Sequence, residues 1–309
     1  LNFRLVLSST LDTLSKGKFF PLFILFSIIL SDTVTDIDGN VYQTVQIGDR
    51  VWMAENLRVT QYNNGYPLYL GYPQDCDDME DQPIWTNAGT PMYTYVDGEN
   101  CEEYEDDYYT DDLGYFYNGY VVHPSLIIVA IPGYPLEGDL EDYNVCPAGW
   151  EIPSNEDWEI LIEELGGSEV AGGLMKETES DYWIDPNSGA TNSSGFTARG
   201  AGMKSGSSEE SFPFFMEKGI FWSTSIDETN NDNIYRSYSV NSSSGGVISW
   251  PDQIESGMSI RCIEESIVEG CMDSEACNYN ETADQDDGSC EYPEENYNCD
   301  GDFIATDIE

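Results

Sequence analysis

Apart from its carboxylates, the chain has few residues that could do chemistry. Its 309 residues contain a single histidine, His123, in the segment Tyr120-Val-Val-His-Pro124. A zinc site built from several histidines is therefore excluded, and a Ser-His-Asp or Cys-His relay would have to use that one side chain. A lone histidine in a loop is usually structural or exposed, so we expect no catalytic residue here. No G-x-x-x-x-G-K-[ST] phosphate loop occurs either.

The eight cysteines point to disulfides rather than to reactive thiols. Neighbouring carboxylates raise the pKa of a thiol, and the cysteines of an exported chain become oxidised. Cys76 and Cys101 flank part of an acidic stretch, residues 74–112, that we interpret as an insertion. A disulfide between them would restrain a loop that buries little apolar surface, although the sequence leaves other pairings open.

A second group of cysteines lies in the C-terminal segment, residues 266–309. Its members are Cys271, Cys277, Cys290 and Cys299. The segment has too few apolar residues for a core, so disulfides or a metal must hold it together. Five residues offer the hard oxygen ligands that Ca²⁺ prefers: Asn278, Asn280, Asp284, Asp286 and Asp287. Their spacing is not that of an EF-hand loop, so turns rich in Asp and Asn are the competing interpretation, and no cofactor is required.

The charge balance limits the possible partners. Fifty-nine acidic residues stand against eleven Lys and Arg, which gives a formal net charge of -48. Binding to nucleic acid depends on Lys and Arg displacing counterions from phosphates, so nucleic acid is excluded as a partner. An acidic, solvated surface is typical of an exported protein in salty surroundings, and part of it could also bind divalent cations.

The N-terminal segment resembles an export signal. Lys16 and Lys18 precede an apolar run, residues 19–30, that is shorter than the roughly 20 residues of a membrane-spanning helix. We expect residues 1–31 to be a signal peptide, the mature chain to have no transmembrane helix, and the protein to be secreted or held at a bacterial cell surface.

Two elements can be predicted from residue patterns. Residues 40–47 and 50–54, separated by the turn Gly48-Asp49, alternate as a β-hairpin does. Ser154 can cap a helix with Asp157 at its third position, and apolar side chains then recur until Gly166-Gly167 ends it. The carboxylates of that helix are expected on its solvated face. A shorter helix at residues 169–177 is weakened by two glycines.

Several motifs occur together in one order. The chain contains Cys146-Pro-Ala-Gly-Trp-Glu-Ile-Pro-Ser154 and, far downstream, Ser259-Ile-Arg-Cys262. Between and before them lie an opening "DxDGNxY…WMAENL" pattern at residues 36–57, an aromatic segment at 113–120, and the segments 171–174, 187–196 and 219–224. This series resembles the Fibrobacter succinogenes major paralogous domain, a bacterial extracellular module. Glu151 departs from the pattern, which usually has His after the CPAGW tryptophan.

The resemblance implies an α+β, C-type lectin-like fold, related to formylglycine-generating sulfatase-modifying enzymes, with short antiparallel strands and one or two helices. It also implies a disulfide between Cys146 and Cys262. Trp52, Trp150, Trp158 and Phe221-Trp222 lie in segments whose neighbours alternate or follow helical spacing, so we expect them to be core. The C-terminal segment resembles Cys- and Asp-rich repeats of exported Bacteroidetes proteins, and it ends in a way that suggests a truncated gene or a missing sorting domain.

We therefore expect a signal peptide at residues 1–31, the main domain at 32–265 and the repeat at 266–309. The expected function is a non-catalytic binding or adhesion module for an extracellular polysaccharide or protein. Exposed loops between Gly195 and Trp250 would present Tyr, Trp, Ser and Asn to that ligand. The alternative is an enzyme of the formylglycine-generating superfamily or a hydrolase, although no second cysteine near Cys262 offers the reactive pair of those enzymes.

Overall fold

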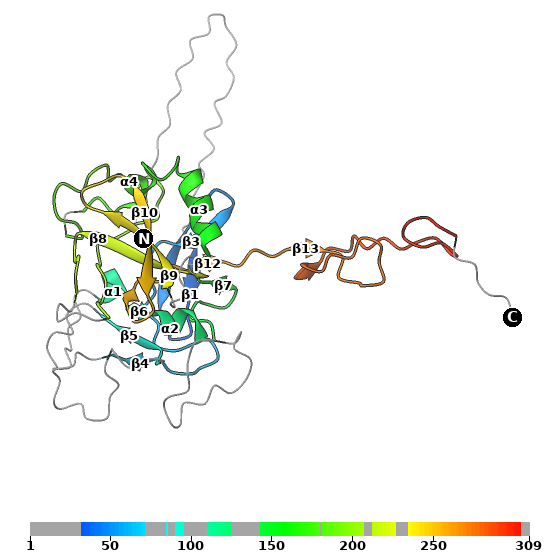
Figure 1. Ribbon diagram of the computed structural model, residues 1–309, viewed down its shortest axis with the longest axis horizontal. Coiled ribbons are helices and arrows are strands. Elements are labelled where there is room, and N and C mark those ends of the chain that lie inside the picture. Colours follow the sequence, from blue (N-terminus) through cyan, green and yellow to red (C-terminus); the bar gives the residue numbers. More distant parts are fainter. Residues whose placement is uncertain are drawn as a thin grey trace, which may run out of the picture. The chain divides into compact units, whose positions relative to one another are not determined.

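Strands, most of them short and paired antiparallel, form most of the regular structure of the protein, which we describe from a computed structural model (Figure 1). The structure describes residues 32–71, 85, 90–95, 110–124, 143–179, 181–206, 212–226 and 234–303. The expected signal peptide, Cys76 and Cys101 lie outside these residues. Within the described part, no helix has the length and apolarity needed to cross a membrane.

A five-stranded sheet joins the beginning of the main domain to its end. Its strand order is β1-β2-β3-β12-β7, with β1 at Thr33–Thr35, β2 at Val41–Ile47, β3 at Arg50–Met53, β12 at Ile263–Glu264 and β7 at Trp150–Glu151. The predicted hairpin is confirmed as β2 and β3, which pair antiparallel with Val45 opposite Trp52. Gly48 in the connecting turn has a φ of 60°, a conformation that glycine adopts without strain.

A second sheet contains three long strands in the order β10-β9-β8. These are β8 at Lys218–Ile226, β9 at Ile234–Asn241 and β10 at Val247–Gln253. The prediction of exposed aromatic loops between Gly195 and Trp250 is therefore wrong for much of that region. Tyr235 and Tyr238 on β9 are buried, while Trp250, on the edge strand β10, remains 53% exposed. Side chains of β8 and β9 alternate between the two faces of the sheet, and buried side chains pack against both faces of these two strands.

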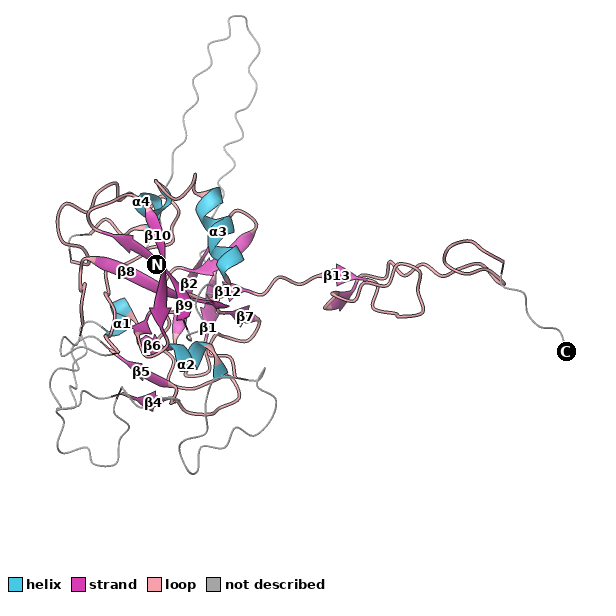
Figure 2. Ribbon diagram, in the orientation of Figure 1, coloured by secondary structure: helices cyan, strands magenta, loops and turns pink. Residues whose placement is uncertain are grey.

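The remaining strands are short. A four-stranded sheet has the order β11-β6-β5-β4, with β11 at Gly257–Met258, β6 at Phe116–Asn118, β5 at Met92–Thr94 and β4 at Tyr69–Leu70. In the C-terminal segment, β13 at Glu269–Gly270 pairs parallel with β14 at Gln285–Asp286. Figure 2 shows how little of the described chain is helical compared with strand and loop.

The longest helix begins and ends where the sequence predicts. Helix α3 spans Asn155–Glu164, and Ser154 forms a capping box with Asp157 at the N-terminal end. Trp158 and Leu161 on its inner face are buried, and its neighbouring glutamates are exposed. Two four-residue helices, α1 at Thr110–Leu113 and α2 at Gly119–Val122, lie on either side of β6 in the sequence.

Helix α4, at Ala171–Met175, is shorter than predicted. Its two glycines have a packing role. A Cβ atom on Gly172 would lie 2.2 Å from the carbonyl oxygen of Gly246, and one on Gly173 would lie 2.4 Å from the carbonyl oxygen of Gly189. Only glycine permits this close approach between α4 and the two loops, so the "AGG" pattern serves tertiary packing at the cost of helix length.

The core divides into two main clusters of buried side chains. One contains Trp52, Trp158, Phe196 and Phe221, whose rings contact one another at centroid distances of 5.1 to 5.9 Å. The other contains Trp150 and Trp222 with the Cys146–Cys262 disulfide. The prediction that these aromatic motif residues are core is confirmed, as is the mixed class of helices and antiparallel sheets.

Candidate functional site

Polar residues of three motif segments meet at one buried cation, Arg261. Arg261 is almost completely buried, and its Nε donates to Oδ1 of Asn56 at 2.6 Å. Its two terminal nitrogens donate to the backbone carbonyls of Met53, Phe196 and Thr197. The guanidinium also lies 4.5 Å from the centre of the Phe196 ring.

Burial lowers the pKa of Arg261 to about 9. Asn56 also bonds elsewhere: its Nδ2 donates to the carbonyl of Leu113 at 2.7 Å and to the hydroxyl of Ser259 at 3.2 Å. Both polar atoms of its side chain have partners within the protein, so this cluster holds three motif segments together.

Lys176 plays a similar part beside helix α4. Its side chain is buried, and its Nζ donates to the carbonyls of Ser188, Asn241 and Ser244 at 2.8 to 2.9 Å. Burial lowers the pKa of Lys176 to about 8. Three donated hydrogen bonds use all three N–H groups of an ammonium, so Lys176 ties two loops to the end of α4.

The disulfides answer part of what the sequence left open. Cys146 is bonded to Cys262, the pairing that the family resemblance implies, and both residues are fully buried. In the C-terminal segment, Cys271 pairs with Cys290 and Cys277 with Cys299. All six cysteines in the described part of the chain are therefore bonded.

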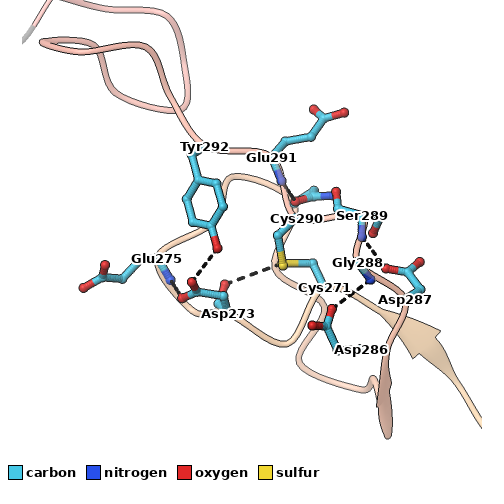
Figure 3. Close-up of a disulfide and its surroundings, with 11 residues drawn as sticks. Cys271, Asp273, Glu275, Asp286, Asp287, Gly288, Ser289, Cys290, Glu291 and Tyr292 are labelled. Carbon is cyan, nitrogen blue, oxygen red and sulfur yellow. Dashed lines mark hydrogen bonds between the residues drawn. A yellow bond between two sulfur atoms is a disulfide. The ribbon is translucent and has the colours of Figure 1, made fainter.

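The five residues considered for Ca²⁺ in the C-terminal segment each serve the local backbone. Asp286 and Asp287 accept from the N–H groups of Gly288 and Ser289, as Figure 3 shows around the Cys271–Cys290 disulfide. The other three accept from backbone N–H groups as well: Asn278, Asn280 and Asp284. These are the bonds of turns rich in Asp and Asn. Among the residues that the structure describes, no three His, Cys, Asp or Glu side chains gather to hold a metal.

His123 is packed rather than poised for catalysis. Its ring stacks on Tyr235 at a centroid distance of 4.0 Å, and burial lowers its pKa to about 4. The ring is therefore neutral at physiological pH.

A pocket of about 480 Å³ lies beside the N-terminal end of α3. Its apolar wall consists of Val122, Tyr143 and Ile152, all buried. Its uncharged polar residues are Asn144, Ser154 and Thr224, and its charged residues are Glu151, Asp157 and Glu265. We call this the acidic pocket. Every charge on its lining is negative.

Backbone and side-chain hydrogen bonds fix the walls of the acidic pocket. The N–H of Glu265 donates to the carbonyl of Gly149 at 2.9 Å, and the N–H of Thr224 donates to the carbonyl of Pro153 at 3.0 Å. Asn144 donates through Nδ2 to the carbonyl of Trp150 at 2.7 Å. The pocket is therefore held by strands β7 and β8, by the segment that follows β12 and by the N-terminal cap of α3.

The three carboxylates of the acidic pocket differ in their surroundings. Both carboxylate oxygens of Asp157 already accept hydrogen bonds. Oδ1 accepts one from Arg50 at 2.9 Å, and Oδ2 accepts one from the backbone N–H and one from the hydroxyl of Ser154. Glu265 is exposed. Glu151 is partly buried, and its carboxylate accepts no hydrogen bond from any residue that the structure describes.

The charges around the acidic pocket shift the pKa of Glu151. Burial raises the pKa of this carboxyl above its ordinary value, and the negative charges of Asp157 and Glu265 raise it further. Arg50 opposes this shift only in part, because its guanidinium is already paired with Asp157. A carboxylate without donors, beside two like charges, is an unfavourable arrangement that a cation would relieve.

Residues 45–264 match the family model described as the Fibrobacter succinogenes major domain. The chain belongs to this family. Searches of curated proteins and of solved structures returned no match. The matched residues therefore include β3, most of both core clusters, Arg261 and most of the acidic pocket, whereas the C-terminal segment lies outside them.

No pattern in the sequence indicates that the residues of the acidic pocket lie close together. Asp157 stands out only as a cap, and Glu265 only as one acidic residue among many. The available signal was Glu151, the single departure from the CPAGW pattern, which lines the acidic pocket in the structure.

Proposed function

We propose that the protein is a non-catalytic, extracellular binding module, secreted or held at the cell surface, whose ligand occupies the acidic pocket. The observation that carries the proposal is the pocket itself, which combines a buried apolar wall with an unpaired carboxylate at Glu151. A concave site with an apolar wall and a few converging polar groups is the usual form of a binding site. The three described disulfides support an oxidising location.

The bonded and buried cysteines argue against the alternative, an enzyme of the formylglycine-generating superfamily. Such an enzyme uses a reactive cysteine pair, and here Cys146 and Cys262 are joined to each other and fully buried. A hydrolase using carboxylates would need an acid and a base that are both free to move a proton. Asp157 is held by Arg50 and Ser154, which leaves Glu151 with only the exposed Glu265.

The fold that we propose is C-type lectin-like. Short antiparallel strands, helices α3 and α4, and a disulfide that links the segment before β7 to the segment before β12 support it.

The test is a screen of the labelled full chain on arrays of extracellular polysaccharides and proteins, followed by mass spectrometry of each captured ligand. The proposal predicts saturable capture of a ligand whose mass stays unchanged after prolonged incubation. A captured ligand that is cleaved or chemically altered, in a manner abolished by Glu151→Gln, would establish the hydrolase alternative instead.

A further inference from the structure

The acidic pocket differs from the acidic surface around it. Clusters of carboxylates are expected on a chain with a net charge of -48 and carry no meaning by themselves. Here the carboxylates line a pocket of about 480 Å³ that also has buried apolar side chains in its wall, Val122, Tyr143 and Ile152. A cavity that has an apolar wall and one sign of charge favours a ligand with both an apolar part and the opposite charge.

The chemistry of the donor set argues against a metal ion. Asp157 has both oxygens engaged by Arg50 and Ser154, so it contributes negative charge but no free ligand atom. Within the described residues, the three acidic side chains do not gather as a metal site requires. Ca²⁺ takes six to eight oxygen ligands, whereas an ammonium group needs a few acceptors around three N–H donors.

We infer that the acidic pocket recognises a lysine side chain of a basic protein segment, with its ammonium group against the carboxylate of Glu151. This inference rests on the proposed binding function and narrows its ligand from polysaccharide or protein to protein. The apolar wall of Val122, Tyr143 and Ile152 suits the methylene stem of lysine, because such stems pack on apolar surface while the charged head keeps its acceptors. Glu265 adds negative charge at the exposed side.

The charge of the whole chain fits the same partner. A net charge of -48 raises the rate at which basic proteins encounter the surface, and it repels anionic polysaccharides. Long-range attraction alone would give binding without a preferred place. The cavity beside Glu151 supplies that place.

The experiment titrates a lysine probe, Nα-acetyl-lysine methylamide, into the full chain at low ionic strength and measures binding by calorimetry or NMR. The comparison probe carries an Nε-acetyl group, which removes the charge and keeps the stem. Glu151→Gln tests the pocket. Glu163→Gln is the matched control, since Glu163 is an exposed glutamate of α3 outside the pocket and loses the same charge.

We expect the charged probe to bind, the acetylated probe to bind at least about tenfold more weakly, and Glu151→Gln to cause a similar loss while Glu163→Gln causes none. Equal binding of the two probes to the wild-type chain overturns the inference without any variant. Equal effects of the two substitutions, or displacement of the probe by millimolar Ca²⁺ alone, overturn it too. If the arrays capture an unmodified ligand while the lysine probe fails, this inference falls and the proposed binding function stands.

Discussion

Arg261 and Asn56, which lie 205 residues apart in the chain, are joined by a hydrogen bond of 2.6 Å from Nε to Oδ1 inside the core. Arg261 comes from the closing Ser-Ile-Arg-Cys motif, and Asn56 from the opening Trp-Met-Ala-Glu-Asn motif. The bond therefore connects the two ends of the matched domain. The arginine and the asparagine of these two motifs are therefore structural components of the fold.

We predict that Asn56→Ala destabilises the protein by about 3 kcal/mol. The substitution removes the acceptor of a buried guanidinium and two further hydrogen bonds, and a buried charge that loses its partner is costly. Urea unfolding followed by tryptophan fluorescence gives the value. Gln46→Ala, on the exposed side of the β2–β3 hairpin, is the control and should change the stability by less than about 0.5 kcal/mol. An equal effect of both changes would contradict the assigned role of Asn56.

Lys176→Met is expected to cost about 2 to 3 kcal/mol. Methionine keeps much of the side-chain volume but leaves the carbonyls of Ser188, Asn241 and Ser244 without the ammonium. In hydrogen-exchange measurements, the backbone amides of residues 187–192 and 241–246 should lose protection first, because these are the loops that Lys176 joins. Unchanged protection of both loops would show that the ammonium is dispensable.

Removal of the Cys146–Cys262 disulfide should lower the free energy of unfolding by about 4 to 5 kcal/mol. The bond spans 116 residues, and cross-links over long loops restrict the unfolded chain most. The double variant Cys146→Ala, Cys262→Ala is compared with the wild type in guanidinium chloride. Peptide mapping without reductant, recovering either cysteine as a free thiol, would refute the pairing itself.

The C-terminal segment should depend on its disulfides rather than on metal. Cys271–Cys290 and Cys277–Cys299 close loops of 19 and 22 residues, each worth about 3 kcal/mol, and the candidate Ca²⁺ ligands already bond to nearby N–H groups. Reductant should therefore expose residues 271–299 to protease, and EDTA should not. Protection that appears with millimolar Ca²⁺ and disappears with EDTA would instead establish the calcium interpretation of this sequence.

Glu151→Gln is expected to stabilise the protein at neutral pH by about 0.5 kcal/mol, a small value because the site is partly solvated. The pKa of Glu151 is raised in the folded state by burial, Asp157 and Glu265, with Arg50 opposing. At a pH just above the ordinary pKa of a glutamate, Glu151 of the folded protein still holds a proton that the unfolded chain has lost. The free energy of unfolding of the wild type therefore falls as the pH rises from that ordinary pKa through the raised pKa of Glu151. The advantage of the variant over the wild type should grow from pH 4 to pH 7. A variant that is less stable than the wild type at pH 7 would show that Glu151 has a structural partner.

Local patterns in the sequence were enough to predict the β2–β3 hairpin, the limits of α3 and the aromatic core. Each depends on neighbours within a few residues: Gly48 in a turn, Ser154 with Asp157 in a capping box, and Trp158 with Leu161 on one helix face. The short α4 could not be predicted, because the reason for Gly172 and Gly173 is the approach of loops far away in the sequence.

The acidic pocket could not be predicted either, because its residues also come from segments that lie far apart in the sequence. Glu151 lies in β7 and Glu265 directly after β12, about half of the domain apart in sequence, and their shared cavity exists only once β12 pairs with β7. The prediction of exposed loops failed at β9, Ile234–Asn241. Its alternating Tyr and Ser residues are typical of an exposed loop in sequence, but the sheet buries them.

The most direct test of the account is to locate the lysine probe on the full chain by NMR chemical-shift mapping. We expect the shifted backbone amides to cluster at residues 144, 151, 152 and 154–157 and at Thr224 and Glu265 around the acidic pocket, with few changes near Asn56 or in residues 271–299. Shifts that cluster instead around Ile248 and Trp250 on the exposed edge of β10, or that spread evenly over the acidic surface, would contradict it.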